Sequence, residues 1–82
     1  MNITIRVCGR YKAIVGQEFA QLDVHGGNTL RNVVDAFVKQ YPLVEKDKKF
    51  MMVLKNKTFA PLDTAITEHD EITISPPVVS GG

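Results

Sequence analysis

Residues 29–42 contain the feature that most restricts the fold, an apolar stripe at helical spacing that stops at a proline. Thr29 or Asn28 can cap its start, because either side-chain oxygen accepts a hydrogen bond from a backbone N–H of the first turn. Pro42 disfavours helical geometry at the preceding residue and has no amide hydrogen, so the helix stops there. A helix with one apolar face must bury that face against another layer. The sequence therefore predicts one main helix that packs on a sheet through Leu30, Val33, Val34, Phe37, Val38 and Tyr41.

Apolar and polar residues alternate on both sides of this helix, which is the pattern of strands with one buried face. The simplest connection between the two segments that precede the helix is a hairpin. Pro76 and Pro77 end the last segment, because neither residue can donate to a ladder. The pattern predicts strands at residues 2–8, 19–24, 51–55, 58–60 and 71–75.

Three connecting segments are also assigned from the sequence. Residues 9–16 begin and end with glycine and are predicted to form a loop in which Ile14 or Val15 folds back as an apolar plug. The charged residues 43–50 are predicted to be a solvent-exposed loop. Residues 61–66 begin with proline and are predicted to form one helical turn with two apolar side chains directed inward.

The order of these elements predicts the topology. Right-handed crossover connections favour a last strand that lies beside the first and parallel to it. The expected fold is a two-layer α+β domain, the ubiquitin-like β-grasp roll, with a mixed four- to five-stranded sheet packed against one main helix. Residues 1–77 would form this domain, and residues 78–82 a flexible C-terminal tail.

Composition argues against several classes of function. The net charge is +1 and the basic residues are scattered, whereas nucleic-acid binding requires a clustered cationic face. No apolar segment approaches the length of a membrane span, and the N-terminus has no signal-peptide pattern. The single cysteine, Cys8, cannot form an internal disulfide, which fits a reducing compartment. We therefore expect one cytoplasmic domain that binds neither nucleic acid nor a membrane.

The domain shows few candidates for a catalytic or metal site. His25 and His69 are not at a metal-ligand spacing, and Cys8 has no evident base partner, so it is interpreted as a structural or incidental thiol. Gly26-Gly27 lacks the longer glycine pattern of a phosphate loop and predicts a turn with positive φ. No metal site, bound cofactor or active site is expected within the domain.

The last residues, ISPPVVSGG, end in a diglycine that has a steric use. Without Cβ atoms, Gly81 and Gly82 can pass through a narrow channel and bring a terminal carboxyl group into a partner's active site. That carboxylate is ionised at neutral pH, so it is a poor acyl electrophile, but it can attack a nucleotide phosphate. Acyl adenylation would activate it. The tail is therefore the expected reactant, and the domain positions it.

Several features together resemble one known family. They are the order of the elements, the helix TLRNVVDAFVKQYP, the segment PLDTAITEHDEITISPP and the terminal diglycine. Over its whole length the chain is similar to the MoaD family, the small sulfur-carrier subunits of molybdopterin synthase. This family belongs to a wider group that contains the thiamine carrier ThiS and ubiquitin-related modifiers. DEITISPP and the diglycine are the most specific parts of the resemblance.

The resemblance implies a mechanism and partners. A MoeB-like adenylyltransferase, related to the ubiquitin-activating enzyme, uses ATP to adenylate Gly82, and sulfur from a persulfide donor then displaces AMP. The thiocarboxylate enters a large, MoaE-like synthase subunit and supplies sulfur for molybdopterin, so the chain is a sulfur donor without an active site of its own. Gly81 would permit this passage, and Ile74 or Phe59 would supply apolar sheet surface for docking. Partner contacts at the exit are expected from Pro76, Pro77, Val78, Val79 and Ser80.

Two details differ from the family pattern. Many members have Pro-Pro-Val, one small residue and Gly-Gly. Here Val78, Val79 and Ser80 separate Pro77 from Gly81, and one additional residue lengthens an extended tail by about 3.3 Å. The turn LKNKTF also lacks the Asn-Gly of many relatives.

Other functions of the same terminus stay open at this point. The chain could carry sulfur for thiamine or for tRNA thiolation. It could also be a ubiquitin-like modifier that is joined to lysines of other proteins through Gly82. A last alternative is a plain β-grasp interaction module whose tail is idle.

Overall fold

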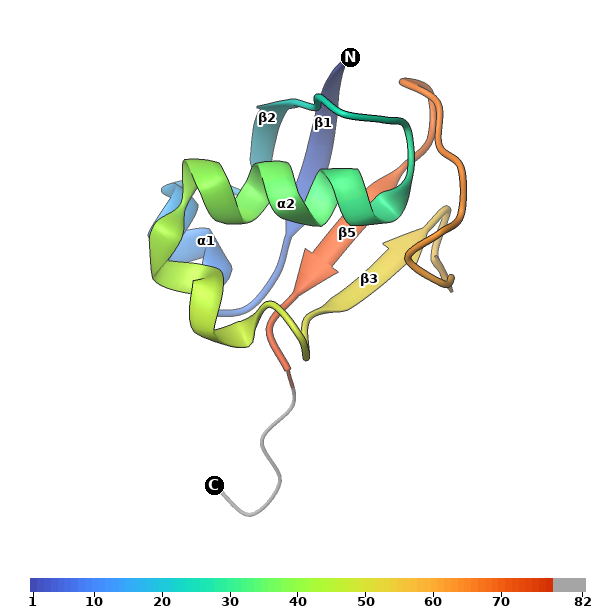
Figure 1. Ribbon diagram of the computed structural model, residues 1–82. Helices are drawn as coiled ribbons and strands as arrows, with labels where there is room; N and C mark the ends of the chain where they lie inside the picture. Colours follow the sequence, from blue (N-terminus) through green and yellow to red (C-terminus); the bar gives the residue numbers. More distant parts are fainter. Residues whose placement is uncertain (78–82) are drawn as a thin grey trace.

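The computed structural model describes residues 1–77, which form a sheet with the main helix α2 across one face (Figure 1). Within these residues five strands build the sheet in the order β2-β1-β5-β3-β4. The predicted two-layer α+β arrangement with a mixed sheet is confirmed. The strands are Asn2–Val7 (β1), Phe19–Asp23 (β2), Met52–Lys55 (β3), Thr58–Phe59 (β4) and Ile72–Ser75 (β5).

β5 lies in the middle of the sheet, between the first and the third strand. β1 and β2 form an antiparallel pair in which Ile3 lies opposite Leu22. β5 runs parallel to β1, with Ile74 beside Val7, and antiparallel to β3, with Ile74 opposite Val53. The predicted position and direction of the last strand are therefore confirmed.

α2 spans Leu30–Gln40, and Thr29 is the residue that caps it. Thr29 Oγ1 accepts a hydrogen bond from the backbone N–H of Asn32 at 3.4 Å, and Asn32 Oδ1 accepts one from the backbone N–H of Thr29 at 3.0 Å. A Cβ atom on Gly27 would lie 2.6 Å from Asn32 Oδ1, so glycine permits the chain to approach this cap closely. The predicted apolar stripe enters the core through its buried members Leu30, Val33, Val34 and Phe37.

The core lies between α2 and the sheet. Alternate residues of the strands point into it, and each large aliphatic side chain that is fully buried contributes about 1.5–3 kcal/mol relative to exposure. Within residues 1–77, no helix combines the length and the apolar composition needed to cross a bilayer. The sheet contributes Ile3, Ile5, Val7, Ala20, Leu22, Val53, Ile72 and Ile74 to this core.

The prediction that residues 9–16 form only a loop is wrong. They contain a short helix, α1, which spans Tyr11–Val15. Ile14 and Val15 are half-buried against the core as expected, but the fully buried side chain is Tyr11, whose ring packs on α2. A helix of barely more than one turn is too short to show an apolar periodicity, so the sequence did not reveal it.

The prediction of an exposed loop at residues 43–50 is also wrong in part. The segment begins with a 3-10 helix, η1, which spans Pro42–Asp47. Pro42 suits its first turn because a residue there needs no amide donor. Val44 and Asp47 of this helix are buried, so only part of the charged run faces solvent.

Residues 61–66 contain a single turn at residues 62 and 63 in place of the predicted helical turn, and the backbone N–H of Thr64 donates to the carbonyl of Pro61 at 3.0 Å. Ala65 makes an isolated antiparallel bridge with Thr29, which ties the segment to the start of α2. Ile66 is buried and Leu62 is half-buried, as the prediction of inward-directed side chains requires.

Candidate functional site

The chain leaves the domain from the end of its central strand. Ser75, the last residue of β5, pairs with Met52 of β3, and the half-buried Pro76 and Pro77 follow it. Neither proline has an amide hydrogen, so the ladder stops here. Because β5 has a neighbouring strand on each side, the position of this exit is fixed relative to the whole sheet.

Gly9 packs against the exit from the side of β1. Its φ of 59° lies in the left-handed region, and an added Cβ atom would be 3.2 Å from Cγ of Pro76. The backbone N–H of Cys8 donates to the carbonyl of Ile74 at 3.3 Å, which extends the pairing of β1 with β5 by one hydrogen bond. Glycine is therefore favoured at position 9 both by the turn and by the close approach to proline.

An ion pair joins the two segments that flank β5 at the exit. Arg10 follows β1 and Asp47 precedes β3, and Arg10 Nη2 lies 2.6 Å from Asp47 Oδ2. The Tyr11 hydroxyl donates to the same oxygen at 2.8 Å. The Asp47 carbonyl accepts from the backbone N–H groups of Phe50 and Met51 at 2.8 and 2.9 Å, so Asp47 also shapes the turn into β3. We call Arg10, Tyr11 and Asp47 the exit cluster. It links the segment after β1 to the segment before β3, the two strands that flank β5.

Burial and hydrogen bonding shift the pKa values within the exit cluster in opposite directions. Burial raises the pKa of Tyr11 strongly, and its hydrogen bond to Asp47 raises it further. Burial alone would raise the pKa of Asp47, but the hydrogen bonds from Tyr11 and Arg10 and the charge of Arg10 lower it below its usual value. At neutral pH the tyrosine is therefore a neutral donor and the aspartate an ionised acceptor.

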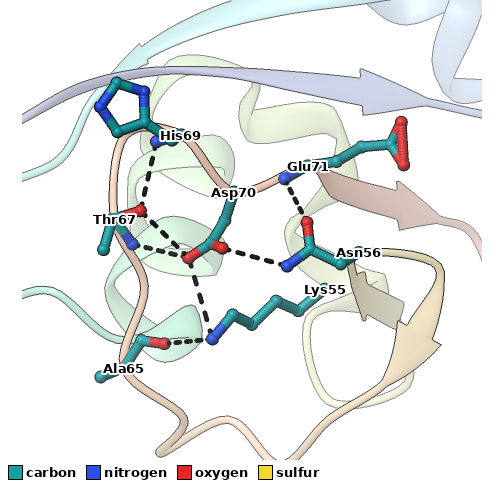
Figure 2. Close-up of polar contacts among 7 residues, drawn as sticks. All are labelled: Lys55, Asn56, Ala65, Thr67, His69, Asp70 and Glu71. Atoms are coloured by element: carbon teal, nitrogen blue, oxygen red, sulfur yellow. Dashed lines mark hydrogen bonds and ion pairs between the residues drawn. The ribbon is translucent and has the colours of Figure 1, made fainter.

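A second polar network lies at the other end of β5 and is shown in Figure 2. Asp70 accepts from the backbone N–H of Thr67 at 2.7 Å and from Asn56 Nδ2 at 3.0 Å, and Lys55 Nζ lies 3.8 Å away. The Thr67 hydrogen bond, followed by that of Asn56, lowers the pKa of Asp70. Asn56 also exchanges two hydrogen bonds with the backbone of Glu71, at 2.7 and 2.9 Å. The β3–β4 turn is thereby tied to the residue before β5.

A row of side chains crosses the sheet on the face that points away from the core, and we call it the outer face. Residues that lie directly opposite each other in paired strands share a face of the sheet. The registers give one continuous row of such residues, with one residue from each of the five strands. Two aromatic side chains at the ends of the row are 51% and 63% exposed, Phe19 and Phe59 respectively. The whole row is Phe19, Arg6, Thr73, Leu54 and Phe59.

The two alternatives for an apolar docking residue occupy different positions. Ile74 is fully buried in the core, whereas Phe59 lies exposed on the outer face. Pro76 and Pro77 lie at the exit, where contact with a partner stays a prediction. The other residues predicted for the site lie outside the described part of the chain, namely Val78, Val79, Ser80, Gly81 and Gly82.

Sequence reasoning missed three residues that shape the exit: Gly9, Arg10 and Asp47. Gly9 was visible only as a loop boundary, because its contact with Pro76 depends on the pairing of β1 with β5. Asp47 lies in a run of charged residues and carries no local sign of burial. Pro42 was the one available indication, because proline is favoured in the first turn of a helix. It could have predicted that residues 42–47 begin an ordered helical segment.

The other polar candidates in the domain have ordinary local contacts. His25 Nε2 lies 3.0 Å from Asp23, and the backbone N–H of His69 donates to Thr67. Cys8 is half-buried, and Gly26 adopts the predicted positive φ, at 84°. Among residues 1–77, no three His, Cys, Asp or Glu side chains are arranged so that they could bind a metal ion.

Comparison with known proteins gives matches that cover most of the chain. The family model described as the ThiS family matches residues 5–82. Among curated proteins, the molybdopterin synthase sulfur carrier subunit of Mycobacterium tuberculosis is 28% identical over 61 residues, which are 74% of each chain.

Solved structures show the same fold. Small archaeal modifier protein 1 of Haloferax volcanii is 28% identical, with a TM-score of 0.78 and complete coverage of both chains. A chain from the complex of subunits 1 and 2 of the molybdopterin-converting factor of Helicobacter pylori has a TM-score of 0.62 at 20% identity, and the match covers 99% of this chain and 100% of that one. The ubiquitin-like β-grasp fold is therefore confirmed. Because the family match extends over residues 5–82, the protein belongs to the ThiS family of sulfur carriers.

Proposed function

We propose that this chain is the sulfur-carrying small subunit of a molybdopterin synthase, with the sulfur bound as a thiocarboxylate on Gly82. The observation that carries this proposal is the family match, which continues through residue 82. It is supported by the curated relative named as a molybdopterin synthase sulfur carrier subunit. The exit from the central strand supports it as well, because a tail that starts there is presented at a fixed position of the domain.

The proposed reaction has three steps before sulfur is delivered. A carboxylate oxygen of Gly82 attacks the α-phosphate of ATP on an adenylyltransferase, and pyrophosphate leaves. The outer sulfur of a persulfide then attacks the acyl carbon, and AMP leaves. A thiol cleaves the resulting S–S bond, which yields the thiocarboxylate and a disulfide. We assign this chemistry to the cytoplasm, where thiols are kept reduced.

The outer face is the proposed contact surface for the partners. Its exposed aromatic side chains, Phe19 and Phe59, are of the type that is enriched in the centres of protein interfaces. The activating enzyme and the large synthase subunit both need the same terminal residue. If both also use this face, the domain can bind only one of them at a time, so release from the first partner precedes sulfur delivery to the second.

A second candidate function is protein modification. The observation that favours it is the similarity to small archaeal modifier protein 1 over the complete length of both chains. The activated Gly82 would then be attacked by a lysine amine of another protein, and an amide bond would form as AMP leaves. Carriage of sulfur for thiamine or for tRNA thiolation uses the same activated terminus and differs only in the acceptor.

The deciding experiment is a reconstitution followed by mass spectrometry of the intact protein. The chain is incubated with ATP, the adenylyltransferase and persulfide donor of its own host, and then with the large synthase subunit and the precursor of molybdopterin. We expect a mass gain equal to the exchange of one oxygen for sulfur, located on Gly82, and its loss as molybdopterin forms. A thiocarboxylate that forms but is not consumed by the large subunit would contradict the assigned pathway, and lysine adducts would favour the modifier.

Matched tail variants separate the chemistry from the fold. Deletion of Gly82 should abolish the mass gain, whereas Ser80→Ala alters the same tail and keeps the diglycine. Both variants should retain the far-ultraviolet circular dichroism of the parent protein, because few core contacts are expected beyond the last strand. Normal activity of the deletion variant would overturn the proposal.

A further inference from the structure

A groove lies between α2 and the chain around β3, and its lining reaches Phe59 at one end of the outer face. Two hollows of about 520 Å³ and 390 Å³ share the lining residues Val34, Lys48, Lys49 and Leu62, and therefore adjoin. The smaller hollow continues along the first half of β3. One end of the groove thus lies near the exit, because Met52 of β3 pairs with the last residue of β5.

The edge of β3 is only half covered by the neighbouring strand. β5 pairs with Met52, Val53, Leu54 and Lys55, but β4 pairs only with the last two of them. Pro61 lies shortly after β4 and lines the groove, and a proline cannot extend a ladder by donating to it. Within residues 1–77, the half of β3 next to the groove therefore has no strand partner on that side.

An uncovered strand edge can accept an additional strand. Its backbone N–H and C=O groups can pair with an extended segment of another chain, and pockets beside the edge select the side chains of that segment. Met52 and Val53 provide the edge here. The floor beside them is apolar, with Val34, Met51 and Leu62 among its lining residues.

The rim of the groove is positively charged. Its lining includes Arg31, Lys48 and Lys49 but a single carboxylate, that of Asp35. Lys48 is paired with Asp35 at 2.7 Å, and Arg31 is paired with Asp63 at 3.0 Å. In the described part of the chain Lys49 makes no ion pair, so its charge is available to a ligand.

We propose that this β3-edge groove binds an extended acidic segment of a partner protein as an added strand beside Met52 and Val53. Alternate side chains of such a strand point to the same face, so apolar residues at every second position would reach Val34 and Leu62. Carboxylates of the segment would pair with Lys49. The proposal does not depend on the chemistry of the terminal glycine, because it rests only on residues of the domain that line the groove.

Binding of a designed peptide to the full chain tests the proposal. The probe is a fluorescein-labelled peptide in which valine and threonine alternate between flanking glutamates, and fluorescence anisotropy measures its affinity. We expect saturable binding that weakens as salt is added. Lys49→Glu should lower the affinity about tenfold or more. The matched control is Lys39→Glu, which makes the same change on α2 away from this groove and should leave the affinity unchanged.

Two further measurements locate the bound peptide. In ¹H–¹⁵N NMR spectra, added peptide should change the amide chemical shifts of Lys49, Met52 and Val53 most. Spectra of the variants without peptide check that the variants fold. N-methylation of the peptide amides that face β3 should abolish binding. The proposal is overturned by shifts centred on Phe19 and Arg6, by equal binding of a peptide flanked by lysines, or by the absence of binding.

Discussion

The two ends of β5 are held by contacts of different kinds. Before the strand, Asn56 forms hydrogen bonds with Asp70 and Glu71, which lie 14 and 15 positions further along the sequence. At the exit, Arg10 and Tyr11 reach Asp47 across 37 and 36 positions. The first network lies on exposed turns, whereas Asp47 and Tyr11 are buried.

This difference assigns separate tasks to the two ends. The turn network fixes the place where β5 begins, and its residues can form their contacts as soon as the hairpin and the turn are made. The exit cluster forms only when α1 and η1 have both packed on the core. The surroundings of the end of β5 are therefore tied to complete folding of the domain.

The largest expected effect comes from removing the carboxylate at the exit. Asp47→Ala leaves the buried Tyr11 hydroxyl and the Arg10 charge without their acceptor, so we expect the free energy of unfolding to fall by about 3 kcal/mol. Urea denaturation followed by circular dichroism measures it. Tyr11→Phe removes one donor and keeps the ring, so it should cost about 1 kcal/mol. If Asp70→Ala proved as costly as Asp47→Ala, the contrast between the ends would be wrong.

Gly9→Ala should have the next largest effect. Alanine at a φ of 59° is strained, and its Cβ would be crowded by Pro76, so we expect a loss of about 2 kcal/mol. Gly16→Ala is the matched control, because Gly16 has a φ of 92° but no atom within 4 Å of an added Cβ. The control measures backbone strain alone and should cost about 1 kcal/mol. Equal thermal and urea stabilities of the two variants would exclude a specific contact with the exit.

The charge of Asp70, in the network before β5, should make the free energy of unfolding depend on pH. The pKa of Asp70 is lowered in the folded protein, so its contribution is complete above the ordinary aspartate value of about 3.9 and is lost as the pH falls through the lower folded value. Asp70→Asn should therefore be less stable than the parent at pH 7, by less than Asp47→Ala, and the two curves should converge in acid. Urea midpoints between neutral and acidic pH measure this, and a constant difference across the range would contradict the assigned charge.

The smallest effect is expected in the β3–β4 turn. Lys57 has a φ of 69°, which glycine adopts without strain, so Lys57→Gly should raise the free energy of unfolding by about 0.5 kcal/mol. Asn56→Gly permits the same backbone geometry, at a φ of 51°, but removes the side chain that contacts Asp70 and Glu71. It should therefore destabilise the protein. Thermal denaturation compares both, and stabilisation by Asn56→Gly would show that the network contributes nothing.

The sequence predicted the parts of the fold that repeat a pattern over several residues. The stripe from Leu30, the stop at Pro42 and the alternation in each strand located α2 and the sheet, and the crossover rule placed β5 beside β1. α1 was missed because its single buried anchor, Tyr11, repeats no pattern. The buried position of Asp47 depends on a partner far away in the sequence, and the surrounding charged residues conceal it.

The same distinction applies to the candidate site. Pro76 and Pro77 were recognisable as the end of a strand from their chemistry alone. Phe59 was one of two residues predicted to supply apolar surface on the sheet, and it lies exposed on β4. The contact of Gly9 with Pro76 requires the register of two strands from opposite ends of the chain. No local property of Gly9 distinguishes it from the other glycines that begin a turn.

The parallel arrangement of β1 and β5 also determines how the domain responds to mechanical load. β1 begins at the end of the sheet opposite to the point where β5 ends, so a force between the first residue and the exit acts along both strands (Figure 1). Such a force shears the hydrogen bonds between β1 and β5 and loads them together. A force that peels β4 from the sheet edge would break its bonds one after another. A pull on the end of β5 against an anchor at the first residue therefore loads these hydrogen bonds together, and not one after another.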